Sequence, residues 1–294
     1  MINFHKYGYL DIKKLSQFYV NRSIKLTSYN PIWLFLWSDV YHPEIAFKNN
    51  MCYIRINVPG VGITYFPPIG DELNTHDALN EIFDDAKEQG IDFNMGPVDD
   101  TMYYKILGQK INLIELKKYE SYTYLNDDIA FMKPSKVKKA KKKYDSFNRH
   151  YKNAYFKRME KEDFNSILEF INTWNMTLNT SSIDSEYYSL LNMLKSSMEH
   201  MYELDLIGII LMNDEKIFGY AIGSIFGNTA YIYQLISDDT DGAKEMLVSS
   251  FAKTCGIASR YLELDFNHGD SIDEKFKEEL NPIGIEKYYA TYGN

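Results

Sequence analysis

The order of the predicted secondary-structure elements is the feature that most constrains the fold of this chain. In residues 154–294, apolar residues recur at helical spacing in some segments and form strand-like runs in others. Short turns such as Asn213–Lys216 separate three successive strands, as in a meander of hairpins. The order is strand, two helices, three strands, helix, strand, helix, strand. These elements are expected at 154–160, 161–175, 183–201, 206–213, 216–226, 229–237, 241–255, 261–266, 271–280 and 284–291.

The first half of the chain repeats this order, apart from the first strand. Two helices are followed by three strands, a helix, a short strand, a helix and a last strand. These elements are expected at 11–20, 30–40, 44–48, 52–58, 62–66, 73–88, 91–93, 97–107 and 111–116. A length of 294 residues suits two domains of ordinary size. The alternative is a single mixed α/β domain with insertions.

This order of elements resembles that of GNAT-type acyltransferase domains. The resemblance implies an α/β protein with mixed sheets and two tandem GNAT-like domains. We place the first domain in residues 1–131 and the second in residues 153–294, with a basic connecting helix in residues 132–152.

The connecting segment predicts an amphipathic helix coated with lysines. Pro134 suits the first helical turn, where its missing N–H costs nothing. Apolar residues spaced by three and four form one face of this helix: Val137, Ala140, Tyr144, Phe147 and Tyr151. Lysines lie opposite this face or beside it: Lys136, Lys138, Lys139, Lys141, Lys142 and Lys143.

The charge of this segment opposes that of the rest of the chain. Between Met132 and Arg158 there are eleven basic residues and one acidic residue, although the formal net charge of the chain is −9. Neighbouring lysines repel one another unless an anion is near, so both a solvated helix face and a polyanion-binding surface fit the pattern. Lysine contacts to phosphate are independent of sequence. A tRNA or an anionic lipid surface therefore fits better than a specific DNA site.

The sequence argues against a coenzyme A site. In GNAT domains the pyrophosphate sits on backbone N–H groups between the fourth strand and the next helix. In the second half this turn is "SDDTDGAKEM", whose aspartates surround Gly242 and would repel a pyrophosphate; in the first half it is "FPPIGDEL", whose prolines lack N–H groups. The histidines and acids show no metal-ligand spacing. We therefore expect no cofactor, acetyl-CoA included, and no metal.

Seven segments carry a resemblance to a known family over most of the chain: "YNPIWLFLW", "YFPPIGD", "SYTYLNDDIAFMK", "INTWN", "DSEY", "GYAIG" and "ELNPIGIEKYYATY". They are similar to motifs of bacterial proteins related to the C-terminal domain of phosphatidylglycerol lysyltransferases. In the lysyltransferases, this tandem GNAT-like domain moves an amino acid from aminoacyl-tRNA to a lipid. The resemblance implies an aminoacyl-tRNA-dependent aminoacyltransferase acting on a lipid or another small acceptor.

Some charged motifs of that family are altered here. The family carries Asn-Arg-Glu-x-Asp near its end, whereas this chain keeps Asn267 and Asp270 but has His268 and a glycine between them. Gln234 stands where the family has the glutamate of a Glu-Lys pair, and lysines replace an Arg and an Asn in the connecting helix. The sequence therefore leaves open whether catalysis is retained.

Aminoacyl transfer requires a grip on the donor, an oriented acceptor and, in many enzymes, a general base. The candidate catalytic residues are Glu186, Asn267 and Asp270. The candidate substrate-binding residues are Tyr122, Tyr124, Gln234 and His268. Each also fits an ordinary structural role, as a carboxylate at a helix start, a capping residue, an exposed loop residue or a packed side chain.

No run of 18 apolar residues occurs, and the first residues lack the pattern of a signal peptide. We expect a cytoplasmic protein, peripheral to the membrane if the lysine helix contacts lipid, whose two cysteines are reduced. Two other functions remain open. One is a non-catalytic binding or structural descendant of the family, and the other is an acetyl-CoA-dependent N-acetyltransferase.

Overall fold

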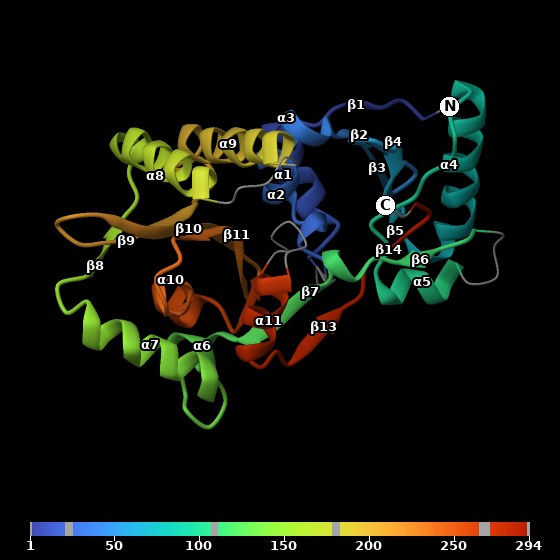
Figure 1. Cartoon of the computed structure of the whole chain (residues 1–294). Helices are drawn as coiled ribbons and strands as arrows, with labels where there is room; N and C mark the ends of the chain where they lie inside the picture. The colour runs from blue at the N-terminus through green and yellow to red at the C-terminus, as the bar shows by residue number, and fades with distance from the viewer. Residues whose placement is uncertain (1, 21–25, 107–110, 178–182, 265–270, 293–294) are drawn as a thin grey trace. The chain divides into compact units, whose positions relative to one another are not determined.

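The computed structural model describes residues 2–20, 26–106, 111–177, 183–264 and 271–292 (Figure 1). Contacts divide the chain into two compact units. Unit 1 comprises Met1–Glu120 and Glu286–Asn294, and unit 2 comprises Ser121–Ile285. None of the described helices is long and apolar enough to cross a membrane.

Unit 1 contains a small antiparallel sheet with the strand order β1-β2-β3-β4, in which β4 and β5 pair with successive parts of β3. A separate pair is formed by β6 and β14. The strands are β1 (His5–Lys6), β2 (Glu44–Lys48), β3 (Met51–Val58), β4 (Gly62–Tyr65), β5 (Ile69–Gly70), β6 (Ile114–Glu115) and β14 (Tyr289–Ala290). The helices are α1 (Tyr9–Gln17), α2 (Pro31–Leu36), α3 (Ser38–Tyr41), α4 (Thr75–Gln89) and α5 (Asp100–Ile106).

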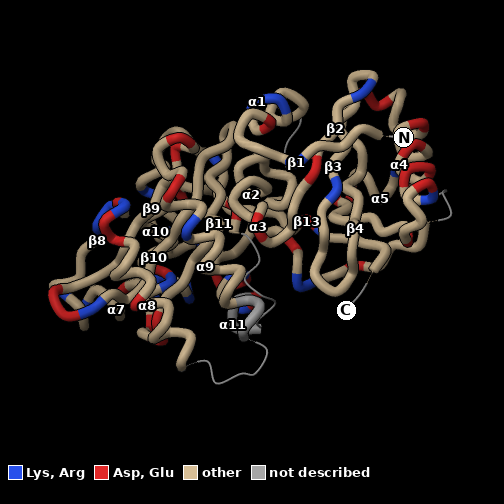
Figure 2. The backbone as a smooth tube through the Cα atoms, turned by 90° about the horizontal axis from the view of Figure 1, so that it is seen from above, with Lys and Arg blue, Asp and Glu red and all other residues tan. Residues whose placement is uncertain are grey.

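The sequence of α4 explains its place in unit 1. Ala78, Ile82 and Ala86 recur every four residues and are buried in the core cluster formed with the sheet. The exposed positions carry acidic residues, which Figure 2 shows as red turns along α4. The solvent-exposed face of α4 therefore contributes to the negative net charge of the chain.

Unit 2 is built on a seven-stranded sheet with the order β13-β7-β12-β11-β10-β9-β8. β11 and β12 run parallel, whereas β7 with β12 and the successive pairs from β8 to β11 are antiparallel. The strands are β7 (Ser121–Leu125), β8 (Tyr155–Arg158), β9 (Ile207–Met212), β10 (Ile217–Phe226), β11 (Thr229–Ser237), β12 (Tyr261–Leu264) and β13 (Gly284–Glu286). The helices are α6 (Asn126–Ala130), α7 (Lys138–His150), α8 (Phe164–Thr177), α9 (Ile183–Glu199), α10 (Ala243–Cys255) and α11 (Ser271–Glu279).

From β8 to β13 the chain follows the predicted order of strand, two helices, three strands, helix, strand, helix and strand. The predicted fold class, mixed α/β with two tandem GNAT-like domains, is confirmed. The division at residues 131 and 153 stays a prediction about the tandem domains. By contacts, residues 121–152 lie with unit 2, because β7 pairs with β12 and α7 packs on α10.

Several predicted elements differ from the structure, among them the helix expected at 30–40, which is two helices, α2 and α3. Residues 91–93 form no strand. The strand expected at 284–291 is two strands, because β13 joins the large sheet while β14 pairs with β6. Pro134 lies in the turn before α7 rather than in its first helical turn, since the helix begins at Lys138.

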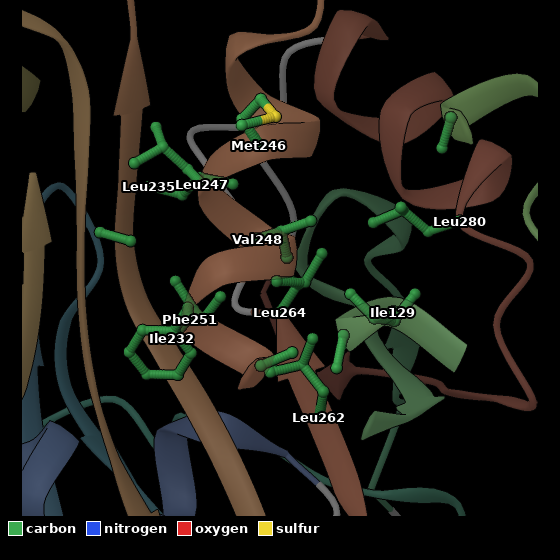
Figure 3. Close-up of a cluster of buried hydrophobic side chains, with 14 of the residues drawn as sticks. Ile129, Ile232, Leu235, Met246, Leu247, Val248, Phe251, Leu262, Leu264 and Leu280 are labelled. Atoms are coloured by element: carbon green, nitrogen blue, oxygen red, sulfur yellow. The ribbon is translucent and has the colours of Figure 1, made fainter. Parts of the chain in front are cut away.

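The core of unit 2 lies between the sheet and α10, as Figure 3 shows. Ile232 on β11 and Leu262 and Leu264 on β12 point toward Val248 and Phe251 on α10 (Figure 3). The outer side of α10 is covered in turn by α6 and α7. Helix α10 is consequently buried over most of its length, as expected for a helix between two layers.

The predicted apolar face of α7 is confirmed. Val137, Ala140 and Phe147 are buried in this core, and Tyr144 and Tyr151 pack against it. Because the apolar face is buried against α10, the opposite face of α7 is left to the lysines. The helix is therefore a docked element of unit 2 and not a basic tail.

Candidate functional site

The two parallel strands of unit 2 are β11 and β12. They pair from Thr229 and Tyr261 to Ile232 and Leu264, and β11 continues to Ser237. Ligands of open α/β sheets bind near the carboxyl ends of parallel strands. This place is therefore the candidate functional site.

A β-bulge marks the same level of β11. Ile222 on β10 lies opposite Gln234, but the next residue, Gly223, lies opposite Ile232. Tyr233 is thus the extra residue of the bulge. Bulges redirect side chains and are over-represented beside active sites, so this irregularity supports the position of the candidate site.

A row of polar side chains crosses the sheet beside this point. Tyr231 on β11 lies opposite Glu263 on β12, which lies opposite Thr123 on β7. Glu263 is only 3% exposed, and its Oε1 accepts a hydrogen bond of 2.6 Å from the Thr123 hydroxyl. Burial and the nearby Glu263 carboxylate hold the pKa of Tyr231 well above its ordinary value. The register thus places a buried carboxylate, which accepts a hydrogen bond from Thr123, opposite a tyrosine whose raised pKa keeps its hydroxyl protonated.

Tyr122 and Tyr124, two predicted substrate-binding residues, are both buried on β7. The Tyr124 hydroxyl donates to the backbone carbonyl of Lys277 on α11 at 2.9 Å, and burial raises the pKa of this tyrosine well above its ordinary value. The Lys277 amino group lies 5.5 Å from the centre of the Tyr122 ring. Because Tyr122 is paired with Leu264, these contacts hold α11 beside the end of β12. A role in substrate binding stays a prediction for both tyrosines.

Gln234, the third predicted substrate-binding residue on a strand, bonds within the protein. Its amide nitrogen donates to the carbonyl of Leu190 on α9 at 2.9 Å, and its amide oxygen accepts from the Tyr220 hydroxyl at 3.1 Å. The side chain is buried. In this arrangement Gln234 ties α9 to β10 and β11, and a substrate contact would need one of these bonds to be exchanged.

The remaining predicted residues fall largely outside the described part of the chain. Asn267, His268 and Asp270 follow β12 in the sequence and lie outside the described residues. Glu186 lies in the first turn of α9, but its side chain is not among those described. Their predicted roles stay predictions.

The six predicted polyanion-binding lysines divide into two groups. Lys141 forms an ion pair with Asp145, and the Lys143 amino group lies 2.8 Å from Glu279 Oε2 and 3.4 Å from Glu245 Oε1. The other four are exposed and form no ion pair within the described ranges: Lys136, Lys138, Lys139 and Lys142.

The first turn of α10, where a GNAT domain would hold a pyrophosphate, is occupied by the protein itself. A Cβ added to Gly242 would lie 2.9 Å from the carbonyl carbon of Lys143 and 2.8 Å from Cβ of Phe147, so the backbone of α7 abuts this turn. Burial raises the pKa of Glu245, while a hydrogen bond from its own backbone N–H and the Lys143 charge act in the opposite direction. A carboxylate of the chain and α7 thus take the place that an anion would need.

We expect Lys143→Met to destabilise the protein by about 1–3 kcal/mol, because it leaves the nearly buried carboxylates of Glu245 and Glu279 without their cation. The matched variant is Lys142→Met, at an exposed position, with an effect within about 0.5 kcal/mol. Urea unfolding of both variants measures the difference. Equal midpoints would contradict the role assigned to Lys143.

Two residues of this region were missed by the sequence analysis. The signal for Glu263 is an acid inside the apolar run "YLELDF", which is unusual for a buried strand. Lys277 is only 5% exposed, yet it occurs in the charged segment "DEKFKEEL", where nothing distinguishes it from surface lysines. Among the described residues, no group of three His, Cys, Asp or Glu side chains could hold a metal ion.

Comparison with solved structures places the whole chain in one fold. A conserved protein of unknown function from Bacteroides thetaiotaomicron is 21% identical, with a TM-score of 0.87 and 99% of both chains covered. The C-terminal domain (DUF2156) of a putative lysylphosphatidylglycerol synthetase from Agrobacterium fabrum is 14% identical, with a TM-score of 0.65, and 97% of this chain and 92% of that chain are covered. L-PGS from Bacillus licheniformis has the same identity and coverage and a TM-score of 0.63.

No curated protein matches the sequence of this chain. The family profile described as phosphatidylglycerol lysyltransferase, C-terminal, matches residues 25–272, which is most of the chain and includes β7, the lysine helix and the parallel strands β11 and β12. The resemblance predicted from short motifs is thereby confirmed. The chain belongs to the phosphatidylglycerol lysyltransferase C-terminal family.

Proposed function

We propose that this protein transfers an aminoacyl group from an aminoacyl-tRNA to a lipid or another small acceptor. The observation that carries the proposal is the family match over residues 25–272, whose description names a lysyltransferase. The buried Glu263, on the parallel strand β12 beside β11, supports the proposal as a carboxylate near the carboxyl end of that strand.

The chemistry requires one proton to be moved. The acceptor amine or hydroxyl bonds to the ester carbonyl carbon of the aminoacyl group, and the bond from that carbon to the ribose oxygen breaks. The acceptor loses a proton and the ribose oxygen gains one, so a single carboxylate can take up the proton and return it. We assign this role to Glu263, held by Thr123, with the neutral Tyr231 hydroxyl as a donor to the developing oxyanion.

The predicted residues Glu186, Asn267, His268 and Asp270 remain candidates for holding donor and acceptor. Asn267, His268 and Asp270 follow Glu263 closely in the sequence, and Glu186 lies at the start of α9. Tyr122 on β7 is paired with Leu264 of β12 and is a further candidate for the acceptor side.

We further propose that the four exposed lysines of the 136–142 segment contact a polyanion, either the tRNA of the donor or an anionic lipid surface. Reversal of Lys138, Lys139 and Lys142 to Glu should weaken tRNA binding and flatten the plot of log K against log salt by roughly two to three units of slope. Filter binding over a salt series measures this. The control variant reverses the exposed Lys6, Lys13 and Lys87 of unit 1 to Glu, which changes the net charge of the chain by the same amount. If both variants lose the same tRNA affinity, the lysines of the 136–142 segment do not form a specific binding surface.

The direct test of the proposed function is transfer of a labelled amino acid from charged tRNA to extracted lipids or small amines. Labelled product that depends on the protein supports the proposal. Because the amino acid is not specified by the family match, a mixture of charged tRNAs is the appropriate donor. Absence of transfer to any acceptor tested would leave a non-catalytic protein.

The non-catalytic alternative has one observation in its favour. The amide of Gln234 and the hydroxyl of Tyr124 both bond within the protein, to Leu190 and Lys277. A descendant that kept the fold as a binding or structural protein would show this pattern. It predicts binding of tRNA or lipid without turnover, which the transfer assay distinguishes.

The acetyl-CoA alternative is opposed by the packing of α7 on the first turn of α10. An N-acetyltransferase would have to seat the pyrophosphate elsewhere. Calorimetry with acetyl-CoA at millimolar concentration should therefore show no binding heat, and a saturable signal would revive this alternative.

A further inference from the structure

Two protruding apolar side chains belong to residues at the two ends of α6, the short helix that precedes the lysine helix α7. Phe131, at the carboxyl end of α6, is 66% exposed, and Ile257, in the short 3₁₀ helix Gly256–Ala258, is fully exposed. Single exposed apolar side chains are common on protein surfaces, whereas several that share one surface mark an interaction site. Their shared position is therefore informative.

Both side chains flank the same short helix. The Asn126 side-chain amide, at the start of α6, donates to the carbonyls of Ala252 and Gly256 at 3.0 and 3.4 Å, which fixes this end of α6 beside Ile257. Phe131 follows the last residue of α6. Since a five-residue helix is about 7 Å long, the two apolar side chains stand at its two ends.

The exposed lysines belong to the layer that α6 and α7 form over α10. Helices α6 and α7 both cover α10 with their buried faces, and Figure 1 shows α10 between them and the sheet. Their exposed faces therefore point away from α10 on one side of unit 2. The turn from Phe131 to Lys138 joins α6 to α7. Lys136 lies in this turn, between the exposed Phe131 and the first residue of α7.

The charge of this surface is positive. Between Asn126 and Asp145 there are seven lysines and three aspartates, of which Asp128 is paired with Lys133 and Asp145 with Lys141. Lys253 and Arg260 add exposed cations on either side of Ile257 in the sequence. Apolar side chains framed by cations are the pattern of proteins that bind the interface of an anionic bilayer, where the apolar groups enter the acyl boundary and lysines meet head groups.

We propose that the surface formed by Phe131, Ile257 and the lysines at 136, 138, 139 and 142 docks unit 2 on an anionic membrane surface. The inference rests on the proposed polyanion surface and selects lipid over RNA. A nucleic acid would use the lysines, but phosphate contacts give no reason for an isoleucine to protrude fully. Docking does not depend on transfer activity, so either can fail without the other.

The test is co-sedimentation of the full chain with phosphatidylcholine vesicles, with and without about one third phosphatidylglycerol. We expect binding only to the anionic vesicles. Phe131→Ser with Ile257→Ser should weaken it at least tenfold, and reversal of Lys138, Lys139 and Lys142 to Glu by tenfold or more. The matched control replaces two exposed leucines of unit 1, Leu10 and Leu73, by Ser and should bind like the unchanged protein.

Each other outcome has a definite meaning. Vesicle binding that the lysine reversal removes and the serine pair leaves unchanged overturns membrane insertion. Binding of unfractionated tRNA without vesicle binding shows an RNA surface and overturns the inference, while the polyanion surface survives. If the chain binds neither vesicles nor tRNA, both the membrane-docking inference and the proposed polyanion surface are overturned. Because Phe131 and Ile257 are exposed, the serine variants should unfold at unchanged urea concentration, so loss of binding is not loss of fold.

Discussion

Replacement of Gly242 by Ala should destabilise the protein by about 2–4 kcal/mol, a large effect for the addition of one methyl group. Gly242 has φ +88°, where a side chain is strained, and its missing Cβ faces the backbone of Lys143 and Cβ of Phe147. Neither neighbour can move cheaply, because Phe147 is buried in the core of unit 2. The methyl group must therefore push α7 away from α10 or distort the turn.

The matched control is Gly227→Ala. Gly227 also has positive φ, +62°, but a Cβ there would meet nothing within 4 Å. It should cost only the backbone strain, about 1–2 kcal/mol. Urea unfolding gives both values, and equal losses in the two variants would show that α7 does not approach the first turn of α10 as closely as described.

The element order and the docked lysine helix could be predicted because both depend on local periodicity. Val137, Ala140 and Phe147 are spaced as one helical face, and that face is the one that α10 buries. The three strands from β9 to β11 are separated by short turns, such as the one in which Asn213 accepts hydrogen bonds from the backbone N–H groups of Glu215 and Lys216. Each of these patterns lies within one short stretch of sequence, so it can be recognised without knowledge of the fold.

The parts that could not be predicted depend on contacts distant in the sequence. β7 precedes the whole second half, yet it pairs with β12, 140 residues later, as the Thr123–Glu263 bond shows. Nothing local in "SYTYL" specifies that partner. Among the ion pairs of the described residues, Lys143 alone of seven neighbouring lysines meets two carboxylates, one from α10 and one from α11. Helical geometry does not distinguish it from the other residues that flank the apolar face.

The candidate site likewise combines residues that the sequence predicts with contacts that depend on distant parts of the chain. The tyrosines of β7 were predicted from motif resemblance, but their burial follows from β7 lying inside the sheet rather than at its edge. Gln234 was predicted as a substrate contact from its place in the motif, whereas its two hydrogen bonds require α9 and β10 to be in position. Glu263 emerged only from the register of three strands.

The largest effect on activity is expected for Glu263→Gln, which should lower the rate of aminoacyl transfer by about 10²–10⁴. The amide keeps the shape of the side chain, and its oxygen can still accept the hydrogen bond from Thr123. It cannot take a proton from the acceptor. We expect kcat to fall while the affinity for tRNA and the midpoint of urea unfolding stay nearly constant, because neither depends on the charge at this position.

Glu245→Gln is the matched control, since Glu245 is equally buried, at 3% exposure, but lies on α10 beside Lys143. It should change stability and leave the transfer rate close to normal. Thr123→Val supplies an intermediate case, because it removes the hydroxyl that donates to the Glu263 carboxylate and should lower the rate by less than Glu263→Gln does. If Glu263→Gln transfers at the unchanged rate while Glu245→Gln is also normal, the carboxylate takes no proton from the acceptor, and the base must be sought among Glu186 and Asp270. If all of the variants are inactive along with the unchanged protein, the β11–β12 site binds without turnover, as the internal bonds of Gln234 would allow.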